Sequence, residues 1–193
     1  MEALDLTVIT PTGDRPIPFS LCRRWMARQT IQPLEWLVVD DGIVPLPEEQ
    51  RTGCTYLRRE RGAGEPAHTL PLNLLVALQH IKSKYIVIME DDDWYAPNYL
   101  EAMLSIMPRS ALGVVGQDHT FYYRLEERAY IQASVPSNHR ASLCATGFVA
   151  GFIPVVAAVC HNAAKQGNGF VDLFMWDVAH AKSFLCETVC IGI

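Results

Sequence analysis

The stretch YIVIMEDDDWYAP, residues 85–97, decides the fold prediction for this chain. Its first five residues are apolar or aromatic without interruption, a pattern typical of a strand buried on both faces of a sheet. The strand runs directly into four consecutive acids at positions 90–93, and a proline follows at position 97. Such strands occur in mostly parallel sheets that carry helices on both faces. The stretch therefore predicts an α/β fold with a carboxylate cluster at the end of a buried strand.

The same alternation of apolar strands and helices continues on both sides of this stretch. The further elements that the patterns predict are strands at residues 6–10, 36–39, 55–57, 111–116 and 188–193, helices at 19–29, 70–81, 97–107 and 171–182, and a hairpin over 121–133. Together they predict a mostly parallel sheet flanked by helices on both faces, with a small antiparallel element.

Length and composition favour one globular domain over residues 1–193, without repeats or a linker. Half of the residues are hydrophobic and 19% are charged, which is enough apolar material for a sizeable core. The net charge of −5 argues against a protein that binds nucleic acid or anionic membranes over a broad basic face.

Three further features predict a cytoplasmic protein. Residues 1–5 are acidic and lead directly into a strand, so no signal peptide is expected. Residues 141–164 carry no charged side chain, but Gly151 and Pro154 interrupt them, which favours a buried core segment over a transmembrane helix. The six cysteines form no C-x-x-C pair, so buried free thiols in a reducing compartment are favoured over a zinc or redox site.

Polar clusters follow three of the predicted strands: residues 10–12, residues 40–42 and the acids at 90–93. Because ligands of open parallel sheets bind at the carboxyl ends of the strands, we expect the three clusters to converge on one site. Consecutive aspartates repel one another, and Mg²⁺ or Mn²⁺, which prefer oxygen ligands, would remove that penalty. The alternative is an acidic N-terminus on the following helix, without a metal.

The three clusters, read in order, resemble glycosyltransferase family 2. They are TVITPT at 7–12, VVDDG at 38–42 and IMEDDDWYAP at 88–97. Enzymes of this family have the GT-A fold and use nucleotide-diphosphate sugars. The resemblance covers about the first 110 residues well, and it implies a nucleotide-sugar-binding half over residues 1–116 and an acceptor-binding half over 117–193.

The resemblance also implies roles for individual residues. The family's D-x-D-D element falls on Glu90 to Asp93, with Glu90 where an Asp is usual, and Leu72 replaces the Arg of an Ala-Arg-Asn segment. The substitution at Glu90 leaves open which of these carboxylates binds the metal directly and which holds the ribose; the implied metal ligands are Asp92, which is favoured, and Asp93. The implied nucleotide-sugar contacts are Pro11, Thr12, Arg15, Asp40 or Asp41 for the base, Asn73, Asp91, and Trp94 for the sugar ring. For Asn73 an exposed helix face, and for Trp94 plain core packing, remain the alternatives.

The resemblance implies a catalytic base at Asp172, within the segment GFVDLFMWD at 169–177, where Val171 replaces the Glu of a Glu-Asp pair. An inverting transferase needs a base within hydrogen-bond reach of the acceptor hydroxyl. Asp172 also fits the N-cap of the following helix. Asp177 lies five residues on, at about 140° around the same helix, and is not expected to face the same substrate.

The leading hypothesis is therefore a metal-dependent transferase that moves a sugar, from a UDP-sugar by preference, to an acceptor hydroxyl. One alternative is a degenerate GT-A domain that binds nucleotide or a partner without catalysis, which the departures at Leu72, Glu90 and Val171 favour. The other is a sugar-phosphate nucleotidyltransferase, although the loop after the first strand lacks that class's glycine-rich pattern.

The acceptor is open between a saccharide, a small molecule and a hydroxylated DNA base, and a homo-oligomer is left open too. The arginines at 23–24 and 58–61 are candidates for contacts with DNA phosphates, with a solvated charged surface as the commoner explanation.

Overall fold

The computed structural model describes residues 4–107, 113–117, 119–132 and 140–193. A seven-stranded sheet crosses the molecule in the order β10-β6-β9-β4-β1-β2-β3. Its strands are β1 (Leu4–Thr12), β2 (Pro33–Asp40), β3 (Thr55–Arg58), β4 (Tyr85–Ile88), β6 (Gly113–Gln117), β9 (Thr146–Val149) and β10 (Ala181–Leu185). All of them run parallel except β9, which is antiparallel to both of its neighbours.

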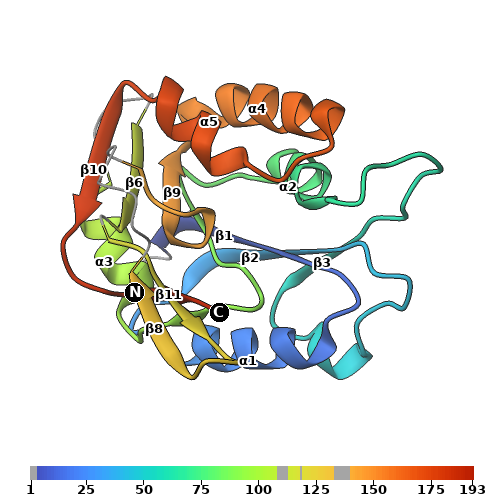
Figure 1. The fold of residues 1–193 in the computed structure, drawn as a ribbon, viewed down its shortest axis with the longest axis horizontal. Coiled ribbons are helices and arrows are strands. Elements are labelled where there is room, and N and C mark those ends of the chain that lie inside the picture. The colour runs from blue at the N-terminus through green and yellow to red at the C-terminus, as the bar shows by residue number, and fades with distance from the viewer. Residues whose placement is uncertain (1–3, 108–112, 118, 133–139) are drawn as a thin grey trace.

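Helices cover both faces of this sheet (Figure 1). One face carries α1 (Pro16–Ala27) and α3 (Tyr99–Ser105), and the other carries α2 (Leu70–Leu78), α4 (Ile153–Gln166) and α5 (Val171–Val178). Short 3-10 turns lie at Glu48–Gln50, Leu143–Ala145 and Ala150–Phe152. Successive strand residues point to opposite faces of the sheet. Val38 therefore packs in the first core, between the sheet and helices α1 and α3, and Leu37 packs in the second core, between the sheet and helices α2, α4 and α5. The continuous apolar strands therefore serve two cores at once.

A smaller sheet lies beside the large one, in the order β5-β11-β7-β8. Its strands are β5 (Trp94–Tyr95), β7 (Phe121–Arg124), β8 (Ala129–Gln132) and β11 (Cys190–Gly192). The buried amide of Gln117 attaches β11 to the end of β6: its Oε1 accepts from the N–H groups of Val189 (2.7 Å) and Cys190 (2.8 Å). Its Nε2 donates to the Cys190 carbonyl at 3.0 Å. The C-terminal strand is thereby fixed close to the end of the acidic loop.

The predicted α/β architecture is confirmed, with three local corrections. The helix expected at 171–182 ends at Val178, because Ala179 is extended (ψ 129°) and the next residues pair as β10 with β6. The two-residue strand β5 was not predicted. The expected buried segment at 141–164 is buried through β9 and on one face of α4, which exposes Pro154, Ala158 and His161, and it contributes the antiparallel strand β9 in the middle of the sheet. Parts of the expected elements, at residues 108–112 and 133, lie outside the described residues.

The six cysteines are all free, and four of them, Cys22, Cys144, Cys160 and Cys190, are buried. This agrees with the prediction of mostly buried thiols. In the part of the chain that the structure describes, no helix has both the length and the apolar character needed to cross a bilayer.

Candidate functional site

A cavity of about 270 Å³ lies at the carboxyl ends of β1, β2 and β4, where the three polar clusters meet. It is lined by Pro11, Thr12, Gly13, Arg15, Asp41, Arg61, Thr69, Leu70, Asn73, Glu90 and Asp92. Six predicted site residues are therefore brought together: Pro11, Thr12, Arg15, Asp41, Asn73 and Asp92. Asp40, Asp91, Asp93, Trp94 and Asp172 are not among its lining residues.

Two loops close tightly on each other at the wall of this cavity. A Cβ atom on Gly13 would lie 2.4 Å from Oδ1 of Asp41, so only glycine fits there without displacing the carboxylate. The carboxylate of Asp14 accepts hydrogen bonds from the N–H groups of Ile43 (2.9 Å) and Val44 (3.1 Å), which lower its pKa. These contacts fix the loop after β1 against the loop after β2.

Asp40 is completely buried, and donors of the protein itself occupy the acceptor positions of its carboxylate. Its Oδ1 accepts from the Gly42 N–H at 2.9 Å and lies 3.3 Å from the Arg58 guanidinium. Its Oδ2 accepts from the Leu46 N–H at 2.9 Å and from the Tyr56 hydroxyl at 2.6 Å. A carboxylate offers about four acceptor positions, and these four contacts use them. Asp40 also does not line the cavity, whereas Asp41 does, and this difference in position assigns Asp40 to the loop and Asp41 to the cavity wall.

Asp41 is held by arginines from the segment after β3. Arg59 donates to its Oδ2 at 2.5 Å, and Arg61 lies 3.3 Å from its Oδ1. Burial raises the pKa of Asp41, but hydrogen bonds from Thr69, Asn73 and Arg59 outweigh it and hold the pKa below its ordinary value. Asp41 is therefore an ionised acceptor at the cavity wall.

Arg59 also fixes the neighbouring amide. Its Nε donates to Oδ1 of Asn73 at 2.7 Å, while its Nη1 contacts both oxygens of Glu65 at 2.8 and 2.7 Å. The Arg59 side chain is only 11% exposed, so the expectation of a solvated charged surface at 58–61 is wrong for this residue. Asn73 is 3% exposed, so the alternative of an exposed helix face is wrong as well.

The acids after β4 point in different directions. Asp91 is buried, accepts from the Thr12 hydroxyl at 2.6 Å and pairs with Arg15 Nη2 at 2.8 Å. Burial raises the pKa of Asp91 to about 7, although Arg15 acts against the shift. Asp92 has 39% of its side chain exposed, lines the cavity and pairs with Arg15 Nη1. Asp91 thus ties the loops together, and Asp92 presents a carboxylate to the cavity.

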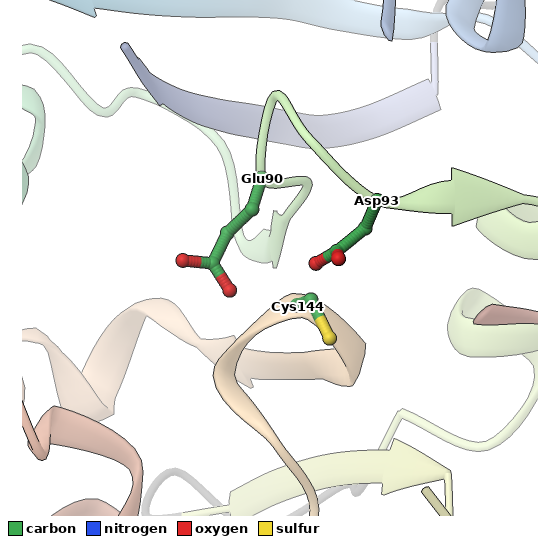
Figure 2. Close-up of side chains that lie close together, drawn as sticks. All are labelled: Glu90, Asp93 and Cys144. Carbon is green, nitrogen blue, oxygen red and sulfur yellow. The ribbon is translucent and has the colours of Figure 1, made fainter. Parts of the chain in front are cut away.

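Asp93 turns away from the cavity, toward the smaller sheet. Its Oδ1 accepts from the N–H of Ile193 at 2.9 Å, and burial raises its pKa to about 6. Figure 2 shows Glu90 and Asp93 on either side of Cys144; one ligand atom of each lies within 4.8 Å of the others. Burial and the neighbouring acids raise the pKa of Glu90 well above its ordinary value.

The residues present fit a divalent cation at the cavity. Burial and repulsion by neighbouring acids, Asp92 among them, disfavour the charged form of Glu90, and a cation would offset both effects. Glu90 and Asp92 supply carboxylate oxygens to the cavity, which suit Mg²⁺ and Mn²⁺. Cys144 is a poor match for these metals, because its pKa is raised by a hydrogen bond with Cys190 and by burial and the thiolate is the form that binds.

The predicted base, Asp172, is the second residue of α5 and is half-buried. The helix is capped at Phe170, so the interpretation of Asp172 as its N-cap is wrong. Burial raises the pKa of Asp172, and its charge contributes to the raised pKa of Glu90, so the two carboxyls are near enough to repel each other. Asp177, at the other end of the helix, lies 3.7 Å from Arg140 instead.

Trp94 begins β5 and pairs with Ile191 of β11, with its ring partly buried against the first core. This matches the alternative of core packing. Sequence reasoning missed Gly13, Arg61, Thr69 and Leu70 as lining residues. The only signal for Arg61 was its place in a charged, glycine-containing loop, which does not indicate the direction of a side chain.

The family model for glycosyl transferase family 2 matches residues 19–164. The similar solved structures include Staphylococcus aureus TarS (10% identity, TM-score 0.63, covering 97% of this chain and 36% of that chain). A TarS structure in complex with UDP-GlcNAc has 12% identity, a TM-score of 0.62 and coverage of 97% and 58%. The mannosyltransferase PcManGT from Pyrobaculum calidifontis, in complex with GDP-Man and Mn²⁺, has 13% identity, a TM-score of 0.62 and coverage of 99% and 57%.

The TM-scores of 0.62 and 0.63 show a shared fold, and at identities of 10–13% the likeness shows the fold alone. The chain spans 36% to 60% of the length of the proteins in these structures and in two further structures of TarS. No curated protein matches the sequence.

Proposed function

Because the chain belongs to glycosyl transferase family 2, we propose that it transfers a sugar from a nucleotide-diphosphate sugar to an acceptor hydroxyl. The observation that carries this proposal is the cavity at the carboxyl ends of β1, β2 and β4. Its lining combines Asp41, Asn73 and Arg61 with Arg15, Glu90 and Asp92. The same cavity thus offers hydrogen-bonding groups for a base and charged groups for a diphosphate and a cation.

The base is recognised by Asp41. Its ionised carboxylate accepts hydrogen bonds, so it selects a base that presents N–H groups on its edge. Uracil does so through its imide N–H, and a UDP-sugar is the donor we favour. Guanine also presents N–H donors, and among the similar structures TarS is in complex with UDP-GlcNAc and PcManGT with GDP-Man, so both nucleotides belong in the test.

Asp92 and Glu90 would hold Mn²⁺ or Mg²⁺ beside the diphosphate. Bound there, the cation stabilises the negative charge that grows on the departing diphosphate. The sequence expectation that Asp93 shares this role finds less support, because Asp93 is bonded to the Ile193 N–H and does not line the cavity. Asp93 instead anchors the C-terminal strand at the rear of the acidic loop.

Asp172 is the proposed base of an inverting reaction. The acceptor oxygen forms a bond to the anomeric carbon as the bond from that carbon to the diphosphate oxygen breaks, and the acceptor proton passes to Asp172. A half-buried carboxyl with a raised pKa is a stronger base than a solvated one. Its position in the first turn of α5 and its electrostatic interaction with Glu90 support this role.

For the acceptor, the structure favours a saccharide or a small molecule over a hydroxylated DNA base. Arg58 pairs with Asp40, and Arg59 with Asp41 and Glu65, so these guanidinium groups face the protein. We propose that the acceptor-binding half is residues 117–193 of a single domain, and that the protein works in the cytoplasm.

The test is a thermal-shift and calorimetric panel of UDP, UDP-GlcNAc, GDP and GDP-mannose, with and without Mn²⁺. Ligand at one hundred times its Kd stabilises the folded protein by about 2.7 kcal/mol, so a specific donor gives a clear shift. Asp92→Asn should abolish the Mn²⁺-dependent part of the shift, whereas Glu127→Gln, on the exposed hairpin, should retain it. If no nucleotide shifts the melting temperature under any condition, the proposal is wrong.

A second candidate function, a domain that binds nucleotide sugars without catalysis, is favoured by one observation. Arg15 already neutralises Asp91 and Asp92, the acids next to the expected metal position. The two candidates separate by product analysis, because a binding domain gives a thermal shift but releases no nucleoside diphosphate with any acceptor. Membership of the family does not favour the third alternative, a nucleotidyltransferase.

A further inference from the structure

Arg15 forms a two-pronged ion pair with the acids that face the cavity. It lies in the loop after β1, and its guanidinium contacts Oδ1 of Asp91 at 2.8 Å and Oδ2 of Asp92. The side chains of Arg15 and Asp92 are 45% and 39% exposed, and both line the cavity. A half-exposed guanidinium of the protein thus lies against the carboxylate that is proposed to bind the metal.

We infer that Arg15 is exchanged between two partners: it pairs with Asp91 and Asp92 before ligands bind, and with the diphosphate of the donor once a metal has displaced it from Asp92. This inference rests on the proposed function and deepens it. Its consequence is that metal and diphosphate bind cooperatively, through the position of one guanidinium.

The exchange follows from charge. A divalent cation and a guanidinium repel each other and compete for the same Asp92 oxygen, so a metal that binds alone must break the Arg15 contact. The released guanidinium remains at the cavity wall because Arg15 lies in a loop that Asp14 and Gly13 fix against the loop after β2. A diphosphate in the cavity gives the fork-shaped guanidinium a new pair of oxygens, in the geometry that arginine prefers.

Asp91 retains a hydrogen-bond donor when Arg15 moves away. Asp91 accepts from the Thr12 hydroxyl at 2.6 Å independently of Arg15. Loss of Arg15 therefore does not leave Asp91 without a hydrogen bond, and the cost of the exchange is concentrated on Asp92. Couplings between two ligands of one site are typically 5-fold to 150-fold, and we expect about 10-fold for this half-exposed pair.

The decisive experiment measures Mn²⁺ binding in the absence of nucleotide, by electron paramagnetic resonance of the free ion. Arg15→Gln should bind Mn²⁺ alone about 10-fold more tightly than the wild type and bind UDP more weakly. A residue that only supports the fold, or only contacts the donor, would not tighten metal binding when it is removed.

The matched control is Arg61→Gln, which removes the same charge from the same cavity. Arg61 contacts Asp41 and not the acids after β4, so its loss should change Mn²⁺ affinity by less than about 2-fold. Arg15→Lys keeps the charge but lacks the fork that spans two carboxylates, so it should fall between Arg15→Gln and the wild type. This variant also carries the test if Arg15→Gln does not fold.

Equal Mn²⁺ affinity of Arg15→Gln and the wild type would overturn the inference, as would an equal gain in Arg61→Gln. Absence of Mn²⁺ binding in every variant would overturn it too. Failure of the nucleotide-sugar panel would refute the proposed function and, with it, the pairing of Arg15 with a diphosphate. The Mn²⁺ titration contains no nucleotide, so it tests the displacement of Arg15 from Asp92 separately.

Discussion

We predict that the two adjacent aspartates have different roles: Asp40 stabilises the loop after β2, and Asp41 binds the base of the nucleotide. The substitution Asp40→Asn tests this prediction. Asparagine has the shape of aspartate but only one acceptor oxygen. In the wild type, Oδ1 of Asp40 accepts from the Gly42 N–H, and Oδ2 accepts from the Leu46 N–H and the Tyr56 hydroxyl. Whichever way the amide lies, its NH₂ group faces a backbone N–H.

The expected loss of stability follows from these contacts. A buried N–H left without an acceptor costs about 1–3 kcal/mol, and more when the lost acceptor was charged. The Tyr56 hydroxyl can rotate and accept from the new amide, so its contact largely survives. We therefore expect a loss of about 2–4 kcal/mol. For a domain of this length that corresponds to a fall of about 5–15 °C in melting temperature.

The assay pairs urea unfolding with calorimetric titration of UDP. Asp40→Asn should unfold at lower urea while its folded fraction binds UDP within about 2-fold of the wild type. Tyr56→Phe, which removes one donor to the same carboxylate, should lose about 1 kcal/mol and leave UDP binding unchanged. Asp41→Asn should weaken UDP binding by about 10-fold or more.

One result would refute the reasoning. If Asp40→Asn has the melting temperature of the wild type but loses UDP binding, then Asp40 contacts the nucleotide. The conformation in which the protein occupies all acceptor positions of Asp40 would then not be the conformation that binds UDP.

Three further predictions concern the loops and the acids. Gly13→Ala should weaken UDP binding about 10-fold, because the new Cβ would lie 2.4 Å from Oδ1 of Asp41; Gly169→Ala, whose nearest neighbour would be 4.0 Å away, should not, and equal affinities in calorimetry would contradict the model. Burial raises the pKa of Asp93 to about 6, so its neutral form is favoured in the folded state; the metal-free protein should lose up to about 3 kcal/mol as pH rises from about 4 through 6. Burial also raises the pKa of Asp91 and of Glu90, which add to the same dependence; urea unfolding at pH 4 and pH 8 should therefore show that Asp93→Asn reduces it without removing it, and an unchanged dependence would count against the prediction. Asp172→Asn should slow transfer about 10²- to 10⁴-fold and leave UDP binding unchanged, whereas Asp177→Asn should transfer at the wild-type rate. Because burial raises the pKa of Asp172, the rate of the wild type should fall on the acid side at a pH above the usual aspartate range. A fall within that range would argue against Asp172 as the base.

The sequence by itself determined the layered α/β fold and the location of the site. Continuous apolar runs are local signals, because a strand buried on both faces must be apolar at every position. The three polar clusters follow strands that run parallel, and parallel strands end at one edge, so their convergence on one cavity could also be predicted. That reasoning needed no knowledge of individual contacts.

Only the tertiary structure decided how individual side chains are used. The sequence left Asp40 and Asp41 equivalent, and what separates them is contact with Leu46, Tyr56 and Arg59, residues 6 to 18 positions away whose directions no periodicity encodes.

The same holds across longer distances. The pairing of Arg15 with Asp92 spans 77 residues, and the hydrogen bond from Ile193 to Asp93 spans 100. The antiparallel strand β9 is placed between β4 and β6 by pairing with strands that are distant in the chain. The physical reason is that apolar patterning reports burial, which is local to an element, whereas the partner of a charged group depends on which distant elements the fold brings beside it.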